Sequence, residues 1–203
     1  MKTIHISNEK DIQQTQDTVL VLGYFDGLHR GHQALFAEAR QIAAEKKLKI
    51  AVLTFPESPK LAFVRYQPDL LLHLNSPEER EQLLEAQGVD YLYLIDFTSC
   101  FAGNKAKDFF EKYVKRLKAR AVVAGFDYHF GSDKKEAKEL SQFFDGQIVI
   151  VSSVNEDDKK ISSTRIRQAI KEGRVADATK LLGYPLSTRG IVVHGNARGR
   201  TIG

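Results

Sequence analysis

Short apolar runs alternate with longer segments of helical period along most of this 203-residue chain. The run from Thr18 to Leu22 has the length of a buried strand. The segment that follows, from about Gly31 to Lys47, places its apolar residues on one face of a helix. Repetition of strand and helix is typical of a parallel sheet wrapped by helices. The chain is therefore predicted to be an α/β protein.

The helix that begins at Pro77 has the strongest start signal, because Ser76 can cap it and Glu79 completes a capping box. Gly88 ends this helix. The other predicted helices are residues 31–47, 105–118, 133–144, 164–172 and 175–182, and the predicted strands are residues 18–22, 49–55, 91–95, 121–124 and 147–151.

Charge and composition narrow the possible functions. The net charge is +4, but residues 186–203 contain three arginines and no acid, so the rest of the chain is nearly balanced. This distribution gives little support for nucleic-acid binding. Cys100 is the only cysteine, so no intramolecular disulfide can form. No run reaches the roughly 18 apolar residues that span a bilayer, and residues 1–8 are too polar for a signal peptide. We expect a cytoplasmic protein without a membrane partner.

Ligands of open parallel sheets bind beyond the carboxyl ends of the strands. The four segments that follow the predicted strands at this edge are therefore the candidate binding loops. They are residues 23–32, 54–59, 125–131 and 152–167.

The first of these segments joins a strand directly to a helix. Its glycines permit a tight turn, and the helix start offers free N–H groups to an anion. His29 and His32 are three residues apart, so they face the same way over the first helical turn and can donate hydrogen bonds to phosphate oxygens. The alternative is two surface histidines near a turn. A chance His-x-Gly-His has a probability of about 1 % in a chain of this length, which favours the phosphate-binding interpretation.

The fourth segment places hydroxyl residues and arginines at another helix start. Ser162, Ser163 and Thr164 can cap free N–H groups or bind phosphate, and Arg165 and Arg167 add permanent charge. The alternative is an ordinary helix cap with solubilising basic residues.

Residues 29–32 resemble the His-x-Gly-His signature of the nucleotidyltransferase superfamily. The Gly-x-Phe-Asp-Gly of residues 23–27 and the Ile-Ser-Ser-Thr-x-Ile-Arg of residues 161–167 resemble the bacterial bifunctional FAD synthetases, which combine riboflavin kinase and FMN adenylyltransferase. The resemblance implies a Rossmann-like sheet in an adenylyltransferase domain of residues 1–185. Residues 186–203 resemble the opening of the β-barrel kinase domain and stop before the Thr and Asn that the family uses there, so no kinase activity is expected of this chain.

Two further loops resemble those of the family less closely. Residues 125–131 look like a loop that lies against the flavin and nucleotide, in which Asp127 would contact the ribose or a metal. The aromatic residues of this loop could instead be core residues. Residues 54–59 resemble the flavin loop, with Pro56 shifted and Ser58 in place of a His.

The resemblance implies transfer of AMP from ATP to FMN, giving FAD and pyrophosphate, with Mg²⁺ entering together with ATP. It assigns catalysis to His29, His32 and Arg167, and no protein residue to a metal. The substrate-binding residues that it implies are Gly23, Phe25, Asp26, Gly31, Thr54, Phe55, Pro59, Gly125, Asp127, Phe130, Lys160, Ser162, Ser163, Thr164 and Arg165.

Two alternatives remain open. One is another adenylyl- or cytidylyltransferase that acts on a different small phosphorylated acceptor. The other is a flavin- or nucleotide-binding protein without catalytic turnover, against which the intact histidine pair argues.

Overall fold

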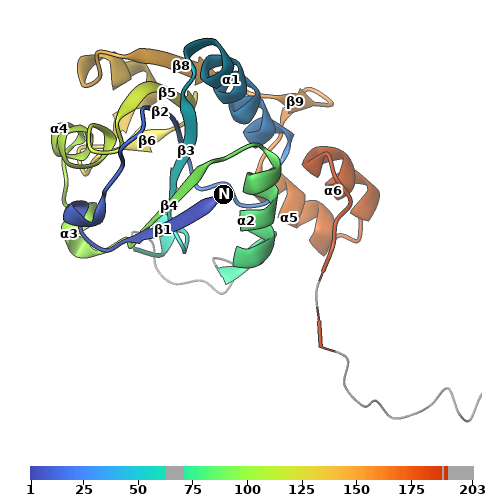
Figure 1. Cartoon of the computed structure of the whole chain (residues 1–203). Coiled ribbons are helices and arrows are strands. Elements are labelled where there is room, and N and C mark those ends of the chain that lie inside the picture. The colour runs from blue at the N-terminus through green and yellow to red at the C-terminus, as the bar shows by residue number, and fades with distance from the viewer. Residues whose placement is uncertain (63–70, 189, 192–203) are drawn as a thin grey trace, which may run out of the picture.

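The buried apolar runs form the strands of one parallel sheet. The computed structural model describes residues 1–62, 71–188 and 190–191. Six strands lie in the order β1-β4-β3-β2-β5-β8, and every neighbouring pair is parallel (Figure 1). These strands are β1 (Lys2–Ile6), β2 (Thr18–Leu22), β3 (Lys49–Thr54), β4 (Tyr91–Ile95), β5 (Ala119–Gly125) and β8 (Gln147–Val151).

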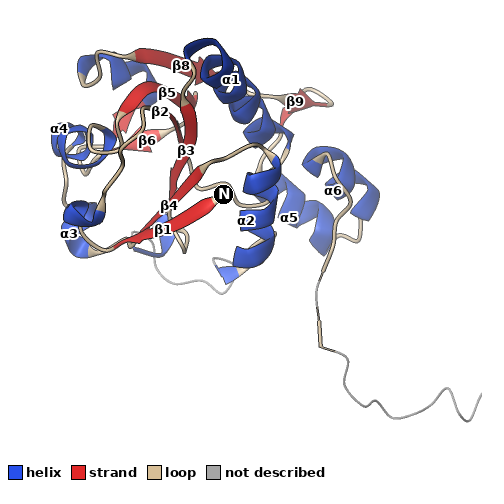
Figure 2. Ribbon diagram, viewed as in Figure 1, coloured by secondary structure: helices blue, strands red, loops and turns tan. Residues whose placement is uncertain are grey.

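Helices cover both faces of the sheet, because successive side chains of a strand point to opposite sides. Val19 and Val21 of β2 pack toward α1 (Arg30–Lys46) and α2 (Pro77–Ala86). Leu20 and Leu22 pack toward the aromatic cluster that includes residues of α4 (Ala106–Phe109) and of the π-helix η4 (Phe110–Val114). Figure 2 shows α1 and α2 on one side of the strands, and α4 with the short helix α3 (Ser99–Ala102) on the other.

A smaller cluster lies beside the sheet. Helices α5 (Ser163–Lys171) and α6 (Val175–Leu182) bury Ile166, Ala169, Leu181 and other apolar side chains against Leu74 and Ile161. The helix α5 is thereby fixed near the loops of the main sheet. No helix in the described part of the chain is long and apolar enough to cross a membrane.

The structure confirms the five predicted strands and most of the predicted helices. The capping box of Ser76 and Glu79 is present, and Gly183 ends α6 in a left-handed conformation, with a φ of 82°. The tail that resembles the start of a kinase domain falls mostly on residues 189 and 192–203, which lie outside the described residues. The predicted domain division at 185/186 therefore stays a prediction.

Two predicted helices differ in the structure. Residues 133–144 form the strand β7 (Lys135–Glu136) and the 3-10 helix η5 (Ala137–Gln142). Lys134 has a left-handed φ of 51°, so no α-helix runs through this position. Residues 105–118 divide into α4 and η4, so their hydrogen-bonding pattern changes within the aromatic cluster.

Five strands in the described part of the chain were not predicted. The edge strand β1 pairs only with β4, and its sequence contains polar residues. Because it has no continuous apolar run, the apolar pattern did not identify it. The short hairpins pair β6 (His129–Phe130) with β7 and β9 (Asn155–Glu156) with β10 (Lys159–Lys160). Two further one-turn helices lie in the described part of the chain, η1 (Glu9–Asp11) and η2 (Pro59–Ala62).

Candidate active site

The strand order reverses at β2. The chain proceeds from β2 outward to β3 and β4, and then continues as β5 on the other side of β2. In open α/β sheets, a ligand crevice lies beyond the carboxyl ends of the strands at such a reversal. The loops that follow β2 and β5 flank this position, as the sequence predicts.

Burial and strained backbone geometry fix the loop after β2. The side chains of Phe25 and Leu28 are almost fully buried, and both residues have left-handed φ values, 59° and 31°. The Thr54 hydroxyl donates to the Tyr24 carbonyl at 3.1 Å. A Cβ atom on Gly23 would lie 2.7 Å from the Phe25 ring, so only glycine fits there. Left-handed residues of this kind persist where the surrounding structure determines them, often at functional sites.

The two motif histidines form a stacked pair at the start of α1. Their ring centroids are 3.7 Å apart, with 14° between the planes. The His29 Nδ1 accepts a hydrogen bond from the His32 backbone N–H at 3.3 Å. A neutral His29 ring must therefore carry its proton on Nε2, which leaves this N–H for a ligand. A Cβ atom on Gly31 would lie 3.1 Å from the His29 ring, so the small residue between the histidines permits the stacking.

Burial keeps both rings uncharged. Desolvation lowers the pKa of His29 to about 4. Desolvation, together with the neighbouring His29, holds the pKa of His32 well below its usual value of 6.5. The His32 Nδ1 is buried without a hydrogen-bond partner. At neutral pH the pair thus offers polar, uncharged groups whose hydrogen bonding is incomplete.

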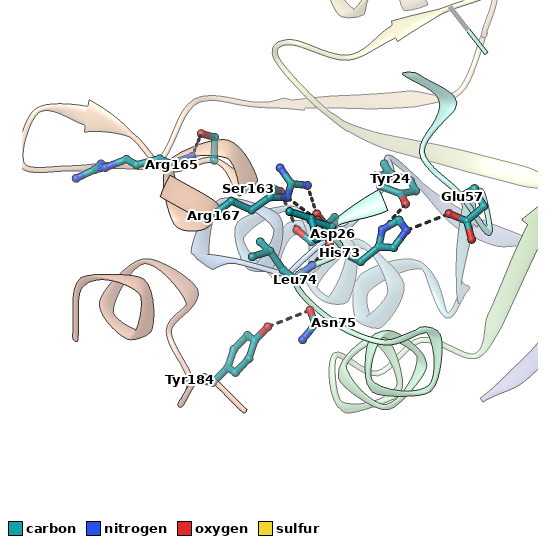
Figure 3. A network of polar contacts seen from close by, with 12 residues as sticks. Tyr24, Asp26, Glu57, His73, Leu74, Asn75, Ser163, Arg165, Arg167 and Tyr184 are labelled. Atoms are coloured by element: carbon teal, nitrogen blue, oxygen red, sulfur yellow. Dashed lines mark hydrogen bonds and ion pairs between the residues drawn. The ribbon is translucent and has the colours of Figure 1, made fainter. Parts of the chain in front are cut away.

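Asp26 connects the loop after β2 to α5. Its carboxylate is 5 % exposed and forms an ion pair with Arg167, while its other oxygen accepts from the Leu74 N–H at 2.8 Å. Arg167 also donates to the Leu72 carbonyl, and the Ser163 hydroxyl donates to the Asp26 carbonyl, both at 2.8 Å. Figure 3 shows Arg167 directed at Asp26 between these segments.

The other residues at the start of α5 have different environments. Ser162 caps the helix by accepting from the Arg165 N–H at 3.2 Å, whereas Thr164 is exposed. The Arg165 guanidinium extends away from Asp26 (Figure 3) and donates to the carbonyls of Glu156 and Lys159 in the β9–β10 hairpin, at 2.8 and 2.7 Å. Arg165 therefore braces this hairpin in the structure.

The loop after β5 meets the same hairpin. Asp127 forms an ion pair with Lys160, and the Lys160 ammonium lies 4.6 Å from the centre of the Phe126 ring. Phe126 is 46 % exposed and directly follows Gly125, the last residue of β5. Residues from two of the four predicted segments thus lie side by side.

Comparison with known proteins is consistent with this arrangement. The FAD synthetase family model matches residues 11–165. The chain belongs to the FAD synthetase family.

The relatives of this family member are named for two activities. The bifunctional riboflavin kinase/FMN adenylyltransferase of Listeria monocytogenes is 42 % identical over the whole chain, and that of Bacillus subtilis is 40 % identical. The chain spans 66 % of the length of each. A crystal structure of a protein named macrolide-efflux protein, from Streptococcus pneumoniae, is 55 % identical with a TM-score of 0.93. It covers 97 % of this chain, and the match spans 66 % of that protein.

Several residues that the FAD synthetase resemblance assigns to substrate binding contribute to packing. Phe130 is 5 % exposed and lies among Phe109, Phe110 and Phe143 in the aromatic core. Phe55, directly after β3, packs against other phenylalanines. Thr54 is buried and donates a hydrogen bond to the Tyr24 carbonyl, and Pro59 is the first residue of η2. Their predicted contacts with substrate stay predictions.

Sequence reasoning missed the segment around His73. The His73 ring bridges the Tyr24 hydroxyl and the Glu57 carboxylate at 3.1 and 3.0 Å (Figure 3). Tyr184, far along the chain, donates to the Gly27 carbonyl at 2.7 Å. Tyr24 lies within the first motif, but His73 and Tyr184 have no local signal, because only the fold brings them to this family motif.

Proposed function

We propose that this chain transfers AMP from ATP to FMN, forming FAD and releasing pyrophosphate. The observation that carries the proposal is the stacked, uncharged pair of His29 and His32 at the reversal of the sheet. The hydroxyl-rich start of α5 is tied to the same loop through Asp26. The family assignment and the names of the relatives agree with this reaction.

The phosphate monoester of FMN can act as nucleophile without a general base. Its second pKa is near 6, as for other phosphate monoesters, so one oxygen is already anionic at neutral pH. That oxygen forms a bond to the α-phosphorus of ATP. The bond between the α-phosphorus and the bridging oxygen breaks, and its electron pair leaves with pyrophosphate. The chain must align two polyanions and stabilise the charge that develops between them.

His29 and His32 are suited to the α-phosphate. A neutral, desolvated N–H donor interacts with developing charge more strongly than a solvated one, and it needs no reorganisation during the reaction. Because the His29 Nδ1 accepts the His32 backbone N–H, the ring proton of neutral His29 lies on Nε2. This N–H is then free to donate to a phosphate oxygen. We assign Ser163, Thr164 and Arg167 to the β- and γ-phosphates.

The cations near these phosphates already have protein partners. Arg167 is paired with Asp26, Lys160 with Asp127, and Arg165 with hairpin carbonyls. We propose that Arg167 keeps Asp26 and uses its remaining N–H groups. Lys160 would exchange the exposed carboxylate of Asp127 for phosphate.

Mg²⁺ fits this site as a companion of ATP. Among the described residues, no group of three or more His, Cys, Asp or Glu side chains is arranged to hold a metal ion. Phosphate oxygens and water are ligands that Mg²⁺ accepts readily, so the ion would neutralise phosphate charge while bound mainly to ATP.

The relatives' names also contain riboflavin kinase. We assign that second activity to the part of the relatives that this chain does not span. For the present chain, the proposal is limited to adenylyl transfer.

Pyrophosphate release from ATP tests the proposal. FMN should support it, whereas pantetheine phosphate, nicotinamide mononucleotide and glycerol phosphate should not. Riboflavin, which lacks the phosphate nucleophile, is the matched control acceptor. Preference for one of the other acceptors would assign the chain to a different nucleotidyltransferase activity. Binding of FMN and ATP without pyrophosphate release would favour a non-catalytic role.

A further inference from the structure

Arg80 is a buried cation with few partners among the described residues. The residue is only 7 % exposed, and one of its terminal nitrogens, Nη2, donates to the Pro56 carbonyl at 3.3 Å. Its Nε–H is buried without a hydrogen-bond partner. None of the ion pairs found in the described part of the chain includes Arg80.

A buried guanidinium without an ion-pair partner is stabilised when an anion binds to it. Arginine keeps its charge at all relevant pH values, and a buried charge without a counter-ion is costly to maintain. Five N–H donors in a planar fork match the oxygens of a carboxylate or a phosphate. By contrast, Arg167 satisfies its charge on the buried Asp26. Arg80 has one carbonyl contact and the face of an aromatic ring.

The position of Arg80 indicates which anion it can reach. Its guanidinium carbon lies 5.5 Å from the centre of the Tyr24 ring, in the loop that carries the motif histidines. Pro56, its hydrogen-bond partner, lies in the loop after β3. The Tyr24 hydroxyl contacts His73 at 3.1 Å. Arg80 therefore lies where three segments meet at the carboxyl ends of β2 and β3.

Two phosphorylated substrates must bind to this edge of the sheet, if the proposed function is correct. The start of α5 and the adjoining hairpin supply the cations that we assign to ATP. Arg80 comes from α2 and contacts the loop after β3 instead. We propose that Arg80 binds the phosphate monoester of FMN and holds the nucleophilic oxygen near the histidine pair. Tyr24 and the Pro56 carbonyl orient the guanidinium for this contact.

Comparing two flavins isolates the phosphate contact. The affinities of FMN and riboflavin are measured by quenching of flavin fluorescence, for the wild-type chain and for Arg80→Met. Wild type should bind FMN at least about 10-fold more tightly than riboflavin. The substitution should weaken FMN binding by about 10- to 100-fold, as for loss of a charged hydrogen bond, and riboflavin binding by less than about 2-fold. The KM for ATP should not change.

Arg40→Met is the matched control, because Arg40 is an exposed arginine that bonds to Gln87 on the surface. It should leave both flavin affinities unchanged. If Arg80→Met does not fold, Arg80→Lys keeps the charge without the fork and should lose part of the preference for FMN. If Arg80→Met weakened the binding of FMN and of riboflavin equally, Arg80 would only support packing, and the proposal would be overturned. Unchanged FMN binding, or a wild-type chain without preference for FMN, would overturn it as well.

These outcomes separate this inference from the proposed function. A wild-type chain that prefers FMN to riboflavin but forms no FAD would contradict the adenylyltransferase proposal and leave the Arg80 contact standing. An Arg80→Met chain that forms FAD with an unchanged KM for FMN would contradict the Arg80 contact alone.

Discussion

The histidine loop after β2 and the basic segment of residues 159–167 belong to the same proposed site but are held in opposite ways. Packing fixes the histidine loop, whose donors are buried and uncharged. Ion pairs and carbonyl contacts hold the basic segment, whose cations are partly exposed. The difference suggests that the first region sets the rate of the chemical step. The second would govern binding of the charged substrate and, at one buried contact, stability.

The largest effect is expected where the two regions touch. Arg167→Ala leaves the Asp26 carboxylate buried without its partner, so it should reduce the free energy of unfolding by about 3–5 kcal/mol. It should also raise the KM for ATP more than Lys160→Ala does, because Arg167 lies within the motif core and has a planar fork of N–H donors, whereas Lys160 is a point charge upstream of it. Lys160→Ala should leave the free energy of unfolding nearly unchanged, because the exposed Lys160 pair contributes about 0–1 kcal/mol. Urea denaturation and ATP kinetics measure both effects. Adding Asp26→Asn to Arg167→Ala should restore most of the stability. Equal losses for the two single variants would contradict the assignment.

The histidine pair should affect the rate of FAD formation more than the affinity for FMN. His29→Ala and His32→Ala should each lower the rate of FAD formation by about 10²–10³, the usual cost of removing one transition-state donor. FMN affinity and the overall fold should change little. His5→Ala, on the exposed side of β1, is the control and should have the wild-type rate. Wild-type turnover in both motif variants would be incompatible with the proposed mechanism.

Acid should destabilise the histidine loop. The unfolded chain binds a proton at His29 near the ordinary pKa of 6.5, whereas the folded chain does so only near the lowered pKa of about 4. The contribution of the neutral His29 ring to the free energy of unfolding is therefore fully present above pH 6.5. It is lost as the pH falls toward 4, and the loss amounts to about 3 kcal/mol. Unfolding free energies between pH 7 and pH 5 measure the slope. His29→Gln should make the slope less steep, while the part due to His32 remains. An unchanged slope would argue against a buried neutral His29 ring.

Gly31→Ala should lower the rate of FAD formation without lowering the unfolding midpoint. Its Cβ atom would press on the His29 ring at 3.1 Å and disturb the stacking, so we expect a rate reduced by about 10-fold. Alanine is the better helix former, and the unfolding midpoint should not fall. Gly190→Ala is the control, since no atom lies within 4 Å of the added Cβ. A variant of Gly31 with full activity would show that the stacking is dispensable.

The smallest effect is expected at the exposed end of the basic segment. Asp127→Asn removes the carboxylate that competes with phosphate for Lys160, so ATP should bind about 2- to 3-fold more tightly at low salt. High salt should remove the difference, because surface charges are screened. Titration of ATP at two ionic strengths measures this effect. Weaker ATP binding would instead give Asp127 a direct role with the ribose or the metal.

Local sequence information was sufficient for much of the fold. Buried runs such as Thr18–Leu22 needed no partner to be identified, and the cap at Ser76 depends only on residues within one helical turn. It was insufficient where tertiary contacts override the local pattern. The helical pattern of residues 133–144 did not reveal the left-handed Lys134, and the polar β1 becomes a strand only by pairing with β4.

The sequence alone determined which residue types the proposed site contains, because the His-x-Gly-His and Ile-Ser-Ser-Thr-x-Ile-Arg patterns are contiguous. Only the tertiary structure decided their physical state. It stacks and desolvates the histidines, pairs Arg167 with Asp26 across 141 residues, and buries Arg80 against Tyr24. Charge state, burial and the choice of ion-pair partner depend on residues distant in the chain, so no local pattern can specify them.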